Sequence, residues 1–156
     1  MGGDAAPEDP FLSLFHGLLK GMLTEELHRK TAARLPRDRT WYRILPQAEG
    51  GPTCEPLPGE VVAAEFAGLV EELAALTGLR RGTGWTFVGE RGGEWLVKVF
   101  NPQQCGSGCG DYTPPVWRVY STLEPSPAAL AAITPPPPDP SRFEAFAARA
   151  RRLLGR

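Results

Sequence analysis

Three segments rich in β-branched and aromatic residues between Gly84 and Leu123 constrain the fold of this chain most strongly. They are Gly84–Gly89, Glu94–Phe100 and Val116–Ser121, and they contain three of the four tryptophans. Residues of these types favour strands, and the Gly, Pro and Asn residues at the segment ends favour turns. The sequence therefore predicts a three-stranded antiparallel meander around which the rest of the chain is organised.

The connection between the first two strands predicts their register. A two-residue turn at Gly92-Gly93 places Arg91 opposite Glu94, a favourable charge pair, whereas a three-residue turn places Glu90 there and turns the second strand over. The shorter turn puts Trp85, Phe87, Leu96 and Phe100 on one face and Val88, Trp95, Val97 and Val99 on the other. Both faces are apolar, so we expect helices to cover both faces, or a partner to cover one of them.

The remaining periodic segments predict helices over this sheet. The segment 10–35 is expected to be helical, with the helix either continuing or restarting at Thr24-Glu25-Glu26. The other expected helices are 60–77, 127–133 and one that begins at Asp139-Pro140, with 40–45 as an edge strand and 46–58 as a connector. Residues 135–140 form a polyproline spacer before the last helix. The expected fold class is α+β, with one domain over 9–156 and a disordered N-terminus over 1–8.

Composition excludes several classes of protein. The net charge is −1, with 17 basic and 18 acidic side chains, so no overall field selects nucleic acid or an anionic membrane. An odd cysteine count of 3 argues against a secreted disulfide scaffold. The acidic N-terminus does not resemble a signal peptide, and no apolar run is long enough to span a bilayer. A cytoplasmic protein without membrane partners is expected.

The first expected helix predicts a surface for self-association. One stripe holds apolar side chains, and two glycines four residues apart permit close helix–helix approach. The candidate seam residues are Phe11, Phe15, Gly17, Leu18, Gly21 and Met22. The alternative is ordinary packing of this helix against a bulky neighbour within the chain. On the first interpretation we expect a homodimer.

A second candidate site combines basic and aromatic side chains between His28 and Arg43. Guanidinium groups neutralise phosphates and aromatic rings stack on bases, as a single-stranded nucleic-acid groove requires. The candidate binding residues are Arg37, Arg39, Trp41, Tyr42 and Arg43. The alternative is a solvated helix end followed by a strand in which Trp41 belongs to the core.

The loop between the second and third meander strands is longer than a hairpin needs and contains Cys105 and Cys109. These thiols, with Cys54, are a candidate zinc site, although the paired spacing typical of zinc ligands is absent. A cysteine nucleophile is a further alternative. The simplest interpretation is two reduced thiols in a flexible, glycine-rich loop, with no cofactor.

No catalytic motif emerges from the sequence, and no catalytic residue is assigned. The expected function is therefore that of a non-enzymatic module acting through protein–protein contacts, with a homodimer as the expected assembly. Small bacterial adaptors, chaperones and immunity-type proteins share this fold class, which is an analogy only. Single-stranded nucleic-acid binding is the second hypothesis, and a thiol or zinc enzyme is the third.

Overall fold

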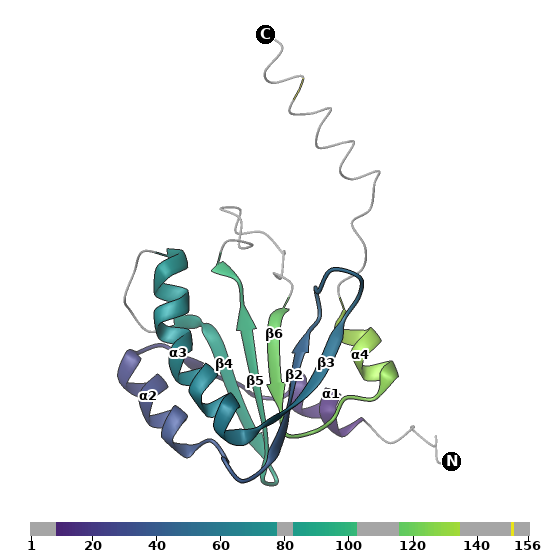
Figure 1. The fold of residues 1–156 in the computed structure, drawn as a ribbon, viewed down its shortest axis with the longest axis horizontal. Helices are drawn as coiled ribbons and strands as arrows, with labels where there is room; N and C mark the ends of the chain where they lie inside the picture. Colours follow the sequence, from purple (N-terminus) through teal and green to yellow (C-terminus); the bar gives the residue numbers. More distant parts are fainter. Residues whose placement is uncertain (1–8, 78–82, 103–115, 135–150, 152–156) are drawn as a thin grey trace, which may run out of the picture.

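The computed structural model describes residues 9–77, 83–102, 116–134 and 151, which form a six-stranded antiparallel sheet and four helices (Figure 1). The elements are α1 (Pro10–Phe15), β1 (Lys20–Met22), α2 (Glu25–Arg34), β2 (Thr40–Leu45), β3 (Thr53–Pro58), α3 (Gly59–Thr77), β4 (Thr83–Arg91), β5 (Glu94–Phe100), β6 (Val116–Ser121) and α4 (Pro127–Ile133). The α+β class predicted from the sequence is confirmed.

The strand order is β1-β4-β5-β6-β2-β3, so the expected meander β4-β5-β6 lies inside a larger sheet. Arg91 pairs with Glu94 across the hairpin, and Val88 pairs with Val97, which confirms the predicted register. Gly92 and Gly93 have φ values of 60° and 82°. Positive φ at both turn residues is what a type I′ turn requires, and glycine adopts it without strain.

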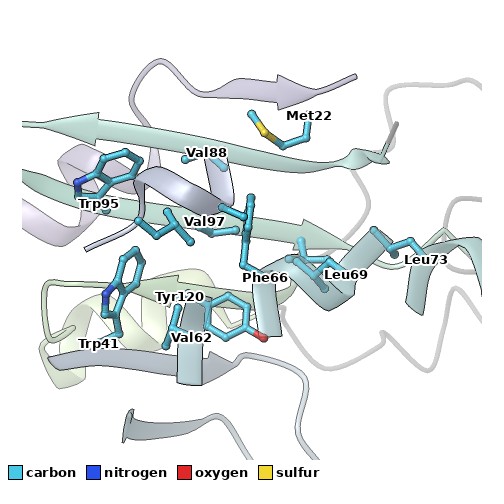
Figure 2. Packing of buried hydrophobic residues seen from close by; sticks show 13 residues of the cluster. Met22, Trp41, Val62, Phe66, Leu69, Leu73, Val88, Trp95, Val97 and Tyr120 are labelled. Carbon is cyan, nitrogen blue, oxygen red and sulfur yellow. The ribbon is translucent and has the colours of Figure 1, made fainter. Parts of the chain in front are cut away.

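Helices cover both faces of the sheet, as the apolar faces led us to expect. On one face, α2 and α3 pack on a cluster that includes Val88, Val97 and Tyr120, and Figure 2 shows α3 side chains directed into it. On the other face, α1 and α4 pack on a cluster that includes Leu96 and Val119. Trp85 was predicted on the same face as Leu96, but it packs instead with the cluster on the α3 side, so this part of the prediction is wrong. The pairing of β4 with β1 is irregular next to this residue.

Of the two alternatives for 10–35, the helix that restarts at Thr24 is observed and the continuous helix is wrong. Helix α1 ends at Phe15, the chain then forms β1, and Thr24 begins α2 by accepting a hydrogen bond from the Leu27 amide (3.0 Å). Glycine is a poor helix former, and Gly21 instead pairs with Phe87 on β4. The Phe87 ring covers Gly21, so sheet pairing compensates for the missing side chain.

Two strand predictions need correction. Strand β2 was expected at an edge but lies between β6 and β3. The expected connector 46–58 contains β3, which forms the edge instead. Pro56 and Pro58 hid this strand, because proline disfavours strands in general but is tolerated at a sheet edge, where one side needs no ladder hydrogen bond.

Helices α3 and α4 match their predicted positions. Phe66 and Leu69 of α3 are fully buried, and the Ser126 hydroxyl accepts a hydrogen bond from the Ala129 amide (3.1 Å) at the start of α4. The expected disordered N-terminus, the polyproline spacer, the last helix and the two-cysteine loop lie outside the described residues. None of the described helices has the length and hydropathy needed to cross a bilayer.

Candidate interaction surface

Two leucines beside the short edge strand β1 are unusually exposed. Leu18 and Leu23 have relative exposures of 102% and 71%. Leu23 lies with Phe87, Lys98 and Phe100 in a patch that we call the β1 surface, and Leu18, whose backbone oxygen lies 3.5 Å from a Cβ placed on Gly89 of β4, borders it. Isolated apolar side chains on a surface are common, so the argument depends on whether the residues of the patch are contiguous.

Gly21 allows the side chains of Leu23 and Phe87 to come together. A Cβ placed on Gly21 would lie 3.3 Å from Cε1 of Phe87 and 3.7 Å from Cδ2 of Leu23, so both side chains meet over this glycine. The Phe87 and Phe100 rings are edge-on, with centroids 5.7 Å apart. The β1 surface therefore extends from the sheet edge across β4 to β5.

Lys98 supplies the charge of the β1 surface. It pairs across the sheet with Phe87 on β4 and Val119 on β6, and its Nζ lies 3.7 Å from the centroid of the Phe15 ring. Burial lowers the pKa of Lys98 to about 8. Among the described residues no carboxylate pairs with it, so cation–π attraction is its only specific electrostatic contact there.

The backbone at both sheet edges is protected against strand addition. Strand β1 has three residues, an exposed Lys20 and an irregular register after Gly21. Strand β3 contains Pro56 and Pro58. Short strands, edge lysines, bulges and prolines all oppose pairing with another chain. Contacts at the β1 surface are therefore expected to be made by side chains.

The structure separates the seam residues expected from the sequence. Phe11, Phe15 and Met22 are at most 5% exposed, and all three are buried in the chain's own core. Gly17 follows α1, and Gly21 lies in β1 under the Phe87 ring. Leu18 is the one exposed large apolar side chain among the six and borders the β1 surface, so the helical seam that carried the prediction is not formed.

Sequence reasoning missed Leu23, Phe87, Lys98 and Phe100 as members of a surface. The sequence does carry one signal for them. Lys98 is one of only three lysines, and it interrupts an otherwise apolar strand. An isolated charge at such a position indicates a strand face that is not fully covered.

The expected nucleic-acid residues do not assemble into a groove. Trp41 is fully buried, and its indole N–H donates to the carbonyl of Pro36 (2.8 Å), so its ring is not available to a base. Arg39 donates to both carboxylate oxygens of Glu94 (2.9 and 3.0 Å). Arg43 pairs with Glu65 (2.6 Å) and Glu55 (2.7 Å), while Arg37 is exposed and Tyr42 is half-buried.

A charged cluster beside α3 is a second candidate site. It borders a hollow of about 370 Å³. Arg118 donates to both oxygens of Glu72 (2.8 and 3.2 Å), and the Tyr120 hydroxyl donates to Glu65 (2.7 Å). Burial raises the pKa of Tyr120, so the phenol stays protonated and acts as a donor. Each charged group has a partner within the cluster, so the cluster fixes α3 on β2 and β6.

The metal hypothesis gains no support from the described residues. Cys54 is exposed on β3, and no three His, Cys, Asp or Glu side chains in the described ranges come together as a metal site. Cys105 and Cys109 lie outside those ranges. Zinc binding by the three cysteines stays a prediction.

His28, at the start of the basic segment, is a buried structural residue. Its ring stacks on Phe66 with centroids 4.2 Å apart, and its Nε2–H donates to the Phe66 carbonyl (2.6 Å). Burial lowers the pKa of His28, so the neutral ring is the folded form.

We expect the free energy of unfolding to fall in acid because of His28. The unfolded chain binds a proton on this ring near its ordinary pKa of about 6.5, whereas the folded protein resists protonation. The contribution of His28 is therefore complete above that pH and is lost as the pH falls toward the lowered folded pKa. Urea unfolding at several pH values measures the slope, which should be shallower in His28→Gln. An unchanged slope would contradict this assignment.

Comparison of the chain with family models, with curated proteins and with solved structures found no match. The functional argument therefore rests on the geometry of the β1 surface.

Proposed function

We propose that this chain is a non-enzymatic interaction module that acts through protein–protein contacts at the β1 surface, with a second copy of the chain as its partner. The observation that supports this proposal is the exposure of Leu23 next to the half-buried Phe87 and Phe100 rings, with Leu18 fully exposed beside the same sheet edge. The roles proposed, by analogy of fold class, are those of an adaptor, a chaperone or an immunity-type protein. A cytoplasmic location remains part of the proposal, on the grounds of cysteine usage.

The energetics favour a moderate affinity. Burying one leucine side chain contributes roughly 1.5–3 kcal/mol, so the four leucines of a symmetric pair contribute roughly 6–12 kcal/mol. Association itself costs roughly 4–15 kcal/mol, so Phe87 and Phe100 must enter the interface as well. A dissociation constant in the micromolar range is the expected result.

We expect Leu18→Glu to abolish dimerisation and leave the fold intact. Because Leu18 is fully exposed in the single chain, its replacement costs the fold no burial, whereas a carboxylate in the apolar interface must lose its hydration. Light scattering after size-exclusion chromatography reports the mass, and circular dichroism checks the fold.

Val61→Glu is the matched control for this experiment. Val61 is 41% exposed on α3, outside the β1 surface, and a glutamate there is compatible with the first turn of a helix. Dimerisation should survive this change. Equal effects of the two substitutions would show that the contacts are not specific to the β1 surface.

A further inference from the structure

We propose that Lys98 is the polar anchor of the interface and that its ammonium group pairs, in the dimer, with a carboxylate of the second copy. This inference rests on the proposed function and adds the chemistry by which the surface selects its partner.

The pairing of the other half-buried cations supports this role. Four basic side chains in the described part of the chain are half-buried, namely Arg39, Arg43, Lys98 and Arg118. The three arginines each bind at least one carboxylate of their own chain. Lys98 is the exception, since its described neighbours are the Phe15 ring and the cross-strand residues Phe87 and Val119.

The surroundings of Lys98 make a partner carboxylate effective. Aromatic and aliphatic side chains lower the local polarity, and two opposite charges attract more strongly there than in water. The carboxylate also stabilises the charged form of Lys98, which burial destabilises. An uncharged apolar partner would instead bury Lys98 without compensation, so the geometry selects against it.

The chain carries suitable carboxylates beside the same edge. Glu25 and Glu26 follow Leu23 closely. Glu25 pairs with Arg29, and the ion pair of Glu26 among the described residues is with Lys30, at 3.2 Å and with both side chains more than 70% exposed. Such an exposed pair contributes little and can be exchanged for a better one. In a two-fold dimer, Glu26 at the start of α2, three residues after Leu23, can face the Lys98 of the other copy.

Association should therefore weaken as the pH rises. In the single chain the pKa of Lys98 is about 8, and a partner carboxylate raises the pKa in the dimer. Above the free pKa, association must take up a proton at each Lys98, which costs affinity. On the elements packed against Lys98, the titratable or charged side chains of the described residues are Glu90 and Arg91 on β4, Arg118 and Tyr120 on β6, and His16 after α1, whereas the residues directly opposite Lys98 are Phe87 and Val119.

The test measures the dissociation constant of the full chain by sedimentation equilibrium at pH 7 and pH 9. For the unchanged protein we expect dimerisation at pH 9 to be weaker by about tenfold for each Lys98 that must be protonated. Lys98→Met should be weak at both pH values. Lys98→Arg, whose guanidinium stays charged, should dimerise at both. Lys20→Met is the matched control, because Lys20 is exposed on β1.

The outcomes separate this inference from the proposed function. If Leu18→Glu dissociates the dimer but Lys98→Met dimerises as tightly as the unchanged chain, with the same pH dependence, the role of Lys98 is wrong and the interface stands. A monomer at every concentration and pH would overturn both the role of Lys98 and the proposed dimer. If Lys98→Met does not fold, the pH-independent dimer expected of Lys98→Arg still decides the question, since pH-sensitive dimerisation of that variant would contradict the assignment.

Discussion

Trp41→Ala is expected to lower the free energy of unfolding by about 3–5 kcal/mol, a large fraction of a typical total of about 5–15 kcal/mol. Trp41 has no exposed surface and lies in the α3-side cluster (Figure 2). The substitution leaves a cavity and also removes the hydrogen bond to the Pro36 carbonyl. Urea unfolding followed by circular dichroism should show a lower midpoint with an unchanged slope.

Trp41→Phe separates packing from the hydrogen bond, and we expect it to cost less than the alanine variant. The same variants test the nucleic-acid hypothesis. A tryptophan that stacks on bases would, when replaced by alanine, weaken oligonucleotide binding at low salt without loss of stability. That result would contradict the core position of Trp41.

Gly59→Ala is expected to destabilise the protein by about 1–3 kcal/mol through overpacking. A Cβ at this position would lie 2.6 Å from the Pro36 oxygen and 2.8 Å from the Arg37 Cα, both backbone atoms that cannot rotate away. The substitution forces the start of α3 away from the segment that leads into β2. Thermal unfolding measures the effect.

Gly68→Ala is the matched control, and it should act in the opposite direction. This glycine lies inside the same helix, and nothing in the described structure lies within 4 Å of an added Cβ. Alanine favours helix over glycine by about 0.8–1 kcal/mol, so we expect a more stable protein. Equal destabilisation by both substitutions would show that the close approach at Gly59 is not the cause.

The parts of the fold that follow from local chemistry could be predicted. Helix α3 has an apolar stripe through Val62, Phe66 and Leu69 that repeats at helical spacing, and all three are fully buried. The hairpin register follows from the Gly92-Gly93 turn and the charge pair beside it. In both cases the residues that determine the structure are close together in the sequence.

The parts of the fold that depend on contacts between residues far apart in the sequence could not be predicted. Phe11, Phe15 and Met22 have helical spacing, yet Met22 lies in a three-residue strand that exists only because β4 pairs with it. Strand β3 was hidden by its prolines. Trp41 shows the same limit, because an aromatic ring among arginines gives no local sign of whether it faces solvent or the core.

The candidate surface was only partly predictable for the same reason. Leu18 was expected at an interface, but for a helical geometry that the chain does not adopt. Leu23 and Phe87 are brought together by pairing between residues far apart in sequence. Lys98 was visible as an isolated charge, yet its lack of a carboxylate among the described residues becomes evident only in three dimensions.

Sedimentation equilibrium of the unchanged chain at neutral pH, over micromolar concentrations, tests the central claim most directly. The proposed interface predicts a monomer–dimer equilibrium, with the mass rising from 16.9 kDa toward twice that value as concentration increases. A mass that stays at 16.9 kDa over the whole range would contradict self-association through the β1 surface.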